Sequence, residues 1–295
     1  MHNTKSIAYT LFALIAFAAN SVLCRLALGD DTIDAASFTV VRLLSSSLTL
    51  LIILNMTKRV NTSSDNIESK GSWVAALMLF TYAACFSFAY VSLDTATGAL
   101  VLFGVVQITM ILVSISTGNK LHIAEWLGVI LAFGGFVYLV LPDVTSPSLS
   151  GLVMMIVAGI AWAVYTLKGK SSTAPLADTA YNFFRTTPLV ILLALIAYPS
   201  IALSMQGVIL AVLSGAIASG IGYTIWYIAL NSLSSTEAAV LQLSVPVIAA
   251  IGGVILVNEM LTLRLVIAGI IILGGILLVV LGRYFMTTKV MNKTT

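Results

Sequence analysis

The chain alternates between long apolar segments and short polar connections. A helix needs about 20 largely apolar residues to cross roughly 30 Å of hydrocarbon, and several windows of the sequence come close to that length. We expect spans at 6–28, 36–54, 73–93, 97–117, 124–141, 150–168, 179–198, 207–230, 236–257 and 262–283. The connections are rich in turn-forming residues, as in GDDTID and STGNKLH. This pattern predicts an all-α polytopic membrane protein with ten transmembrane helices.

Composition and charge support this interpretation and orient the chain. Hydrophobic residues make up 60% and charged residues 8%, which leaves too little polar surface to cover a soluble core. With a cytoplasmic N-terminus, Arg25 and Arg264 fall outside, Arg42 and Arg185 fall within spans, and the other basic residues fall inside. This positive-inside bias predicts that both termini are cytoplasmic. Since the basic residues are spread over short loops, no nucleic-acid partner is expected.

The two halves of the sequence repeat one another. Residues 97–141 align with 236–281 when one gap is allowed, and FTVVR ending at Arg42 matches YNFFR ending at Arg185. The offsets are all close to about 140 residues and run in order along the chain, as copies of one supersecondary unit do. We therefore expect a first five-helix repeat over 1–145, a second over 146–285 and a cytoplasmic tail over 286–295.

A unit of five helices has an odd number of crossings, so its second copy must enter the membrane from the opposite side. Such inverted-topology repeats are typical of secondary transporters, which use them to build alternating access to a central site. The sequence therefore predicts a transporter in which the substrate site lies between the two repeats.

The segment LSVPVIAAIGGVILVNE, residues 243–259, together with residues 260–275, resembles part of a known family. Pro246, Glu259, the stretch 261–263 (LTL) and the glycines at 274–275 match the end of the EamA-type repeat of the drug/metabolite transporter superfamily. The resemblance covers nearly the whole chain.

The first half resembles the family less closely. Gln107 stands at the proline position and Asn119 at the glutamate position, while Gly128 and the glycines at 134–135 are kept. The resemblance implies a ten-helix inner-membrane carrier, commonly an exporter of amino acids or other small metabolites. It also implies that the fifth and tenth helices are scaffolding and that the other helices line the central cavity.

Polar and aromatic groups within the spans are the first candidates for substrate binding, because such groups are costly in lipid unless they meet a partner or water. Asn20, with Trp162 as its repeat mate, could bind a zwitterion through its amide. Its alternative role is an interhelical hydrogen bond.

Two aromatic faces occupy corresponding helices of the two repeats. Tyr82, Phe86 and Tyr90 are spaced i, i+4, i+8 on one helix face, and the second repeat carries Tyr223, Trp226 and Tyr227. Aromatic stripes also occur in plain helix cores and in interfacial belts. Duplication in both repeats favours a substrate surface, although Tyr90 lies nearest a membrane boundary and could be a belt residue.

Gln107 and Gln242 are amides in the corresponding fourth and ninth spans. A proline frees the carbonyl four residues earlier, so Pro246 within a helix would expose the carbonyl of Gln242 to a cavity. Tyr165 is a weaker candidate, as are the hydroxyls of Thr109 and Ser244, which often bond their own backbone.

Three charged residues receive other interpretations. Arg42 and Arg185 each lie about six residues inside a span, a depth of roughly 9 Å, from which a long side chain can reach the headgroups. A structural or lipid-facing role is favoured for both, with gating or anion attraction as the alternative. Glu259, at the end of its helix, is expected to belong to a turn or a gate network.

A membrane enzyme is the rival class, and it would need a nucleophile with a base, or a cluster of metal ligands. The histidines, His2 and His122, lie in a tail and a loop, and Cys24 and Cys85 lack ligand spacing. We expect no catalytic residues, no metal and no cofactor. The expected partners are a small-molecule substrate and the lipid bilayer, and the expected state is a monomer.

The substrate and the coupling mechanism remain open between alternatives. The first helix carries no acid that could exchange a proton, which favours facilitated export over proton coupling. We expect an alternating-access exporter of amino acids, with aromatic or bulky apolar ones preferred because of the aromatic faces. The alternatives are a cationic drug carrier, which would need a cavity acid, and a membrane scaffold without transport.

Overall fold

The computed structural model describes residues 4–60, 71–116, 118, 123–140, 147–169, 172–230 and 241–294. In these ranges the chain is helical, and its one extended pairing is an isolated bridge between Ile33 and Leu203. The first half contains α1 (Thr4–Gly29), α2 (Ala35–Val60), α3 (Trp73–Tyr90), α4 (Thr95–Ser116) and α5 (Ile123–Val140). The second half contains α6 (Leu149–Gly169), α7 (Pro175–Arg185), α8 (Thr187–Ala197), the 3-10 turn η1 (Tyr198–Ser200), α9 (Met205–Val212), the π-helix η2 (Leu213–Ile221), α10 (Gly222–Leu230), α12 (Val245–Leu256) and α13 (Leu263–Thr294).

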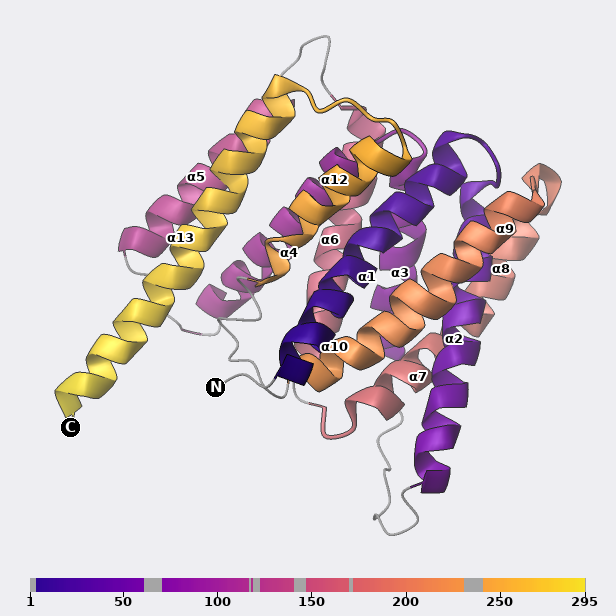
Figure 1. Cartoon of the computed structure of the whole chain (residues 1–295), viewed down its shortest axis with the longest axis horizontal. Helices are drawn as coiled ribbons and strands as arrows, with labels where there is room; N and C mark the ends of the chain where they lie inside the picture. Colours follow the sequence, from indigo (N-terminus) through magenta and orange to yellow (C-terminus); the bar gives the residue numbers. More distant parts are fainter. Residues whose placement is uncertain are drawn as a thin grey trace.

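Most helices are built to cross a bilayer. Within the described ranges, seven candidate spans are long and apolar enough, and three shorter apolar helices cover 125–139, 245–256 and 263–279. The all-α polytopic membrane fold expected from the sequence is therefore confirmed. The start of α1 and the end of α13 lie toward the lower side of the molecule (Figure 1).

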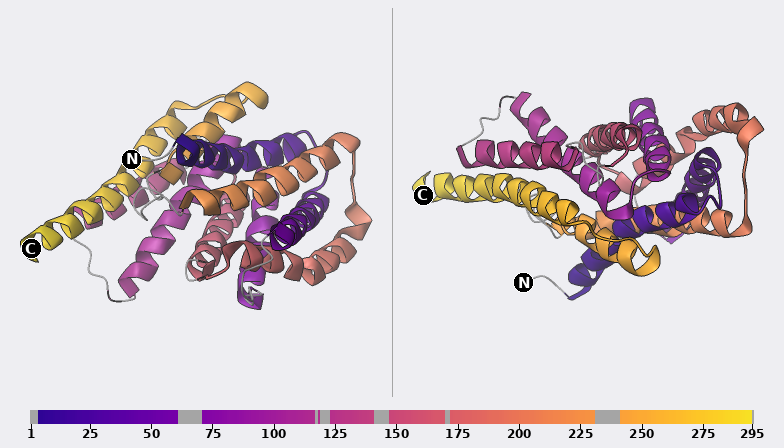
Figure 2. Two further views of the ribbon diagram at one scale, coloured as in Figure 1. Left: turned by 60° about the horizontal axis from the view of Figure 1, so that its bottom comes forward. Right: turned by 90° about the horizontal axis from the view of Figure 1, so that it is seen from above.

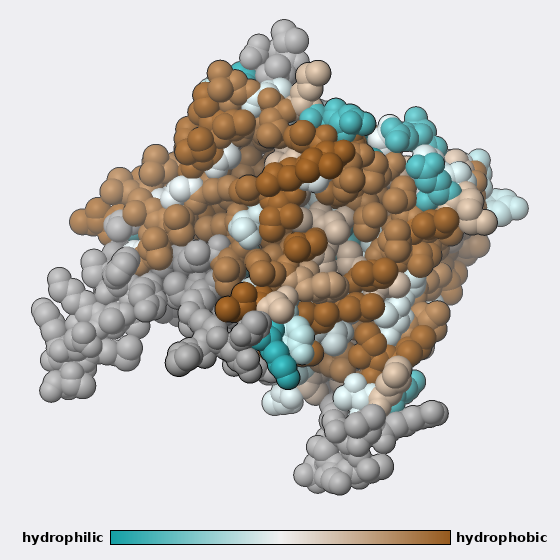
Figure 3. All heavy atoms as spheres, viewed as in Figure 1, coloured by the Kyte–Doolittle hydropathy of each residue, from teal (hydrophilic) through white to brown (hydrophobic). Residues whose placement is uncertain are grey.

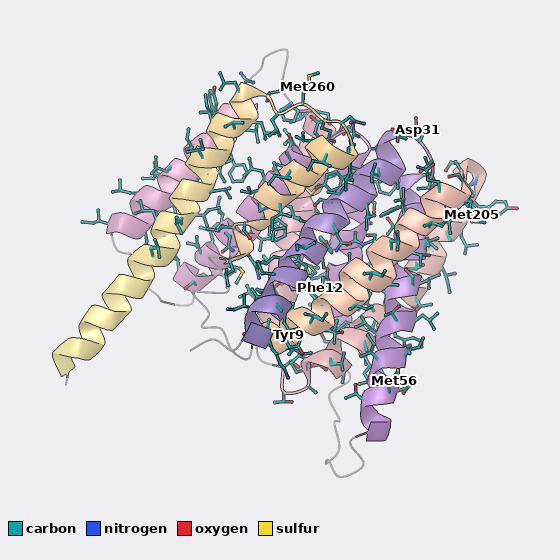
Figure 4. The ribbon with its side chains drawn as sticks, in the orientation of Figure 1. Tyr9, Phe12, Asp31, Met56, Met205 and Met260 are labelled. Atoms are coloured by element: carbon teal, nitrogen blue, oxygen red, sulfur yellow. The ribbon has the colours of Figure 1, made fainter. Side chains whose placement is uncertain are left out.

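The outer surface is apolar, as contact with lipid requires. Leu48, Ile130 and Leu195 are each more than 60% exposed, and apolar residues cover most of the face in Figure 3, with hydrophilic ones gathered mainly toward its ends. The exposed Asp31, Met205 and Met260 lie at the upper connections (Figure 4). An exposed apolar belt between two polar ends is the surface of a membrane-embedded protein.

Helices α5 and α13 form a pair at one edge of the molecule. They pack against each other along their length and run side by side in both Figure 1 and Figure 2. Gly128 and Gly275 allow the close approach, because a Cβ on either would lie 2.4 or 2.6 Å from the other's carbonyl oxygen. The scaffolding role expected for the last helix of each repeat stays a prediction.

Three spans that the sequence presents as continuous are interrupted. Helix geometry breaks at Thr186 between α7 and α8, just before Pro188, whose ring cannot continue the hydrogen-bond ladder. The next crossing passes through the π-helix η2. The expected span 236–257 is helical again only from Val245, after a turn at 243–244, and its first residues lie outside the described ranges.

Candidate functional site

Aromatic side chains from five helices meet in the core between α1, α3, α6, α7 and α10. We call this group the aromatic cluster. Its members are Phe17, Tyr82, Phe86, Tyr90, Trp162, Tyr165, Phe183, Tyr223 and Trp226. Six of the nine are residues that the two aromatic faces or the repeat alignment predicted, and Tyr165 was a weaker candidate.

Trp162 joins the two halves of the cluster. Its ring centroid lies 4.7 Å from that of Tyr82 on α3 and 5.2 Å from that of Tyr223 on α10. Tyr223 in turn lies 5.7 Å from Phe17 of α1. Tilted and edge-on pairs at these separations are favourable beyond simple burial of area. The aromatic residues of α1, α3, α6 and α10 therefore form one continuous packed group.

Tyr90 belongs to the buried core, and the belt interpretation is wrong. Its side chain is fully buried, its ring packs 4.8 Å from Phe86, and its hydroxyl donates to the Thr95 carbonyl at 3.3 Å. Gly98 makes room for it, because a Cβ there would lie 2.4 Å from the Tyr90 ring. The position of Tyr90 near the end of α3 could not predict its burial, because the room for its ring is provided by Gly98 of α4.

Asn20 bonds across helices, as its alternative interpretation proposed. Its Oδ1 accepts hydrogen bonds from the hydroxyls of Ser214 at 2.8 Å and Ser219 at 3.4 Å, both from η2. The three residues are buried. Asn20 thus connects α1 to the π-helix, and a role in substrate binding remains a prediction.

Gln107 and Gln242 lie on segments that contribute no ring to the aromatic cluster. Gln107 is buried within α4, and Gln242 is half-buried just before α12. Pro246 is not inside a helix as expected: it lies in the first turn of α12, where the missing N–H removes no intrahelical bond. The Ser244 hydroxyl donates to the Leu241 carbonyl at 2.6 Å and so stabilises the preceding turn.

The remaining weaker candidates add little to the cluster. Thr109 is half-buried within α4. Tyr227 lies in α10, but its side chain is outside the described residues, as are Asn119 and His122. Among the described residues, no group of three or more His, Cys, Asp and Glu side chains is placed to hold a metal ion.

Arg42 is part of the core, and the expectation that it reaches the lipid headgroups is wrong. Its side chain is only 2% exposed. The guanidinium carbon lies 4.8 Å from the Phe86 ring centroid and 5.4 Å from that of Tyr82, and Nη2 donates to the Tyr82 hydroxyl at 3.1 Å. Packing of α2 against η2 and α3 turns this face of α2 inward. Arg42 therefore adds a positive charge to the aromatic cluster.

The π-helix η2 packs closely beside Arg42. Ser46 donates to the Gly215 carbonyl at 2.9 Å, and a Cβ on Gly215 would lie 2.3 Å from the Arg42 carbonyl oxygen. π-Helical turns are frequent at functional sites. Sequence reasoning missed η2, Phe17 and Phe183; only the Gly and Ser content of 213–221 indicated a close helix contact.

Glu259 ties three segments together at the upper end of the molecule. Its carboxylate accepts from Arg25 Nε at 3.1 Å and from the Thr95 backbone N–H at 2.9 and 3.0 Å. It thus sits at the N-terminus of α4, where the helix dipole favours an anion. Arg25 also donates to the Tyr90 and Val91 carbonyls at 3.1 and 3.3 Å. We call these contacts the Arg25–Glu259 network.

A pocket of about 260 Å³ opens near this network, between the α3–α4 turn, α5 and the start of α13. Its lining includes Ser92, Asp94, Ser148 and Thr262 and none of the predicted site residues. The aromatic cluster is the better candidate site, because it combines burial, aromatic surface and a charge.

The apolar helices, the broken crossings and the buried polar core define a polytopic membrane protein of the transporter type. The EamA-like transporter family model matches residues 4–141 and 149–281. The chain belongs to this family, which is part of the drug/metabolite transporter superfamily. The resemblance indicated by Pro246, Glu259 and the paired glycines is therefore confirmed.

Relatives agree with this assignment. The chain is 44% identical to an uncharacterized protein of Pseudomonas aeruginosa, with 96% of this chain and 97% of the relative covered. It is 31% identical to an uncharacterized transporter of Archaeoglobus fulgidus over 70% of this chain and 74% of the relative. A solved structure titled "Crystal structure of protein" shares the fold at a TM-score of 0.59 and 18% identity, covering 92% of this chain and 95% of the other.

Proposed function

We propose that the protein is an inner-membrane, alternating-access exporter of amino acids or similar small metabolites, with aromatic or bulky apolar substrates preferred. One observation carries the proposal: buried aromatic rings from α3, α6 and α10 pack in one cluster, and two of them, Tyr82 and Phe86, contact Arg42. Aromatic walls with a few placed polar groups are typical of small-molecule sites. Tyr82, Phe86, Trp162 and Tyr223 would contact the apolar part of the substrate.

The architecture that we propose is ten crossings in two inverted repeats, over 1–145 and 146–285. Helix contacts come in matching pairs: α3 packs on α6 as α10 packs on α1, and α4 packs on α6 as α12 packs on α1. An inverted repeat would produce this exchange of equivalent contacts, and it would also provide two half-open states around one site. The charge distribution of the loops supports cytoplasmic termini.

The Arg25–Glu259 network would act as a gate in this cycle. It joins α1, the start of α4 and the segment after α12 at one end of the molecule. Charge-assisted hydrogen bonds between separate helices stabilise one arrangement and must break in another. The structure would then represent the state that is closed at the upper end.

Facilitated export is the coupling that we propose. Among the described residues, the ionisable groups that interact with Arg42 are Tyr82, Tyr223 and Cys24, and none of these is a carboxylate. A cation in the cluster disfavours the cationic drug carrier, because like charges in a buried site repel strongly. A membrane scaffold and a membrane enzyme remain as alternatives of another class.

Counterflow in proteoliposomes tests the proposal. Purified full-length protein would be reconstituted with internal L-phenylalanine, L-leucine or L-alanine, with and without a pH gradient. We expect counterflow of L-phenylalanine and L-leucine that does not need the gradient. Absence of counterflow with every amino acid would refute the substrate class, and strict dependence on the gradient would refute facilitated export. A scaffold predicts that Asn20→Ala and Gln242→Ala leave a cellular export phenotype unchanged.

A further inference from the structure

The guanidinium of Arg42 is buried with one of its nitrogens unpaired. The side chain is 2% exposed, Nη2 donates to the Tyr82 hydroxyl, and Nη1 has no hydrogen-bond partner. In the described part of the chain, ion pairs within 4 Å involve Arg25, and none involves Arg42. The charge therefore has aromatic neighbours and a phenol, but no counter-ion.

Such a charge is costly. Moving an ion from water into a protein interior carries a large desolvation penalty even after relaxation. The cation–π contacts with Phe86 and Tyr82 and one charge-assisted hydrogen bond to the Tyr82 hydroxyl offset only part of this cost, because they leave Nη1 without a partner. An anion beside Nη1 would offset the rest, because bonds between guanidinium and carboxylate are charge-assisted.

The surroundings hold the guanidinium in place for such an anion. Phe86 covers the guanidinium at 4.8 Å, and the Tyr82 hydroxyl fixes one edge at 3.1 Å. The Arg42 backbone is fixed as well, because the Ser46 hydroxyl shares its one proton between the Arg42 carbonyl at 2.7 Å and the Gly215 carbonyl of η2 at 2.9 Å. A planar fork held on one face and one edge is preorganised to bind a carboxylate through the remaining edge.

We propose that Arg42 binds the carboxylate of the transported substrate while the aromatic cluster binds its apolar part. This inference rests on the proposed function and narrows it. Glu259 is an acid that lies near Tyr90 of the cluster, but its carboxylate already binds Arg25 and the Thr95 N–H. The amino group of an amino acid would therefore have to compete with these donors for a charged partner. The substrate class is therefore aromatic or bulky apolar monocarboxylates, among which amino acids are one subset.

Ligand binding to the wild-type protein gives the first test. Trp162 and Trp226 belong to the cluster, whereas Trp73 and Trp126 are 62% and 51% exposed, so quenching of the cluster tryptophans can report binding. The probes are L-phenylalanine, 3-phenylpropionate and L-phenylalaninamide. We expect the two carboxylates to bind and the amide to bind about 10- to 100-fold more weakly, the effect of losing a charge-assisted hydrogen bond.

Variants locate the effect at Arg42. Arg42→Gln should remove the preference for 3-phenylpropionate over the amide, and Arg42→Lys should retain part of it, since lysine keeps the charge but not the fork. Arg185→Gln is the matched control: Arg185 holds the corresponding place in the second repeat and also has a buried Nη1 without a hydrogen-bond partner, but it packs over Trp73, 5.8 Å from the ring centroid, and not on a ring of the cluster. We expect it to keep the preference.

The outcomes separate this inference from the proposed function. Counterflow of L-phenylalanine with equal binding of acid and amide would overturn the role of Arg42 and leave the exporter intact. Failure of both carboxylates to bind the folded wild-type protein would overturn the inference directly. If Arg42→Gln fails to fold, the comparison of acid and amide on the wild-type protein and on Arg42→Lys still decides the question.

Discussion

Replacement of Glu259 by Gln should open the upper end of the molecule. The change removes the ion pair to Arg25 at 3.1 Å and weakens the bond from the Thr95 N–H. The Glu259 and Arg25 side chains are only 10% and 20% exposed, so solvent screens their contact little. A hydrogen bond to a charged group contributes about 1.5–3 kcal/mol. If the contacts exist only in the closed state, loss of about 2 kcal/mol shifts the equilibrium toward the open state about 30-fold.

Cys24 provides the assay. It is fully buried beside Arg25, and the chain contains two cysteines, so a Cys85→Ser background makes Cys24 the single thiol. In proteoliposomes, Glu259→Gln should raise the rate at which a membrane-impermeant reagent modifies Cys24. The increase should approach about 30-fold when opening is fast, because the rate then follows the open population.

Asp94→Asn is the control for this experiment. Asp94 lies 3.8 Å from the same guanidinium but its side chain is 60% exposed, and exposed pairs contribute about 0–1 kcal/mol. It should therefore change the rate at most about fivefold. Equal rates in wild type and Glu259→Gln, or equal effects of Glu259→Gln and Asp94→Asn, would refute the gate. In a double variant with Arg25→Gln the loss of the Arg25–Glu259 bond should count only once, so the second change should add only the loss of the Arg25 bonds to the Tyr90 and Val91 carbonyls.

Two further predictions concern stability, measured by thermal unfolding in detergent. Burial raises the pKa of Asp34, but hydrogen bonds, chiefly from Ser37, outweigh it and hold the pKa below its usual value. Asp34 therefore stabilises the fold above the unfolded-state pKa, and this contribution is lost as the pH falls through the folded-state pKa. Asp34→Ala should cost about 1 kcal/mol near neutral pH, because α2 loses its N-cap. It should also weaken the acid dependence of the Tm, and an unchanged pH profile would contradict this role. Gly275→Ala should cost about 1–3 kcal/mol by overpacking, because its Cβ would lie 2.6 Å from the Gly128 carbonyl oxygen. Gly274→Ala is the control, since a Cβ there would meet nothing within 4 Å and should leave the Tm unchanged. Equal effects of the two changes would contradict the close α5–α13 contact.

Periodicity along single helices predicted much of the candidate site. The spacing of Tyr82, Phe86 and Tyr90 predicted one face of α3, and the corresponding helix of the second repeat carries Tyr223, Trp226 and Tyr227. The repeat alignment indicated Trp162 as the mate of Asn20. These patterns depend only on helix geometry, so they can be recognised without knowing how the helices pack. They could not show that the faces meet, because that depends on which helices become neighbours.

Arg42 shows where sequence reasoning ends. The sequence placed Arg42 at the correct depth within its span. At that depth an arginine side chain can either reach the headgroups or be buried in the protein. The choice depends on whether α2 turns this face to lipid or to α3 and η2, which is a property of tertiary packing. Pro246 is similar: the proline was visible, but the turn before it that makes it a helix start was not.

The two halves are therefore built alike but differ where chemistry is concentrated. Arg42 and Arg185 occupy matching places, yet Arg42 packs on Phe86 in the cluster while Arg185 packs over Trp73. Pro246 and Gln107 differ in the same way between α12 and α4. A carrier with one substrate molecule at a central site needs one charged anchor there, since a second buried cation nearby would raise the desolvation cost without adding a bond. If Arg42 alone binds the substrate carboxylate, the two repeats must differ at this position, and Arg185→Gln tests that difference directly.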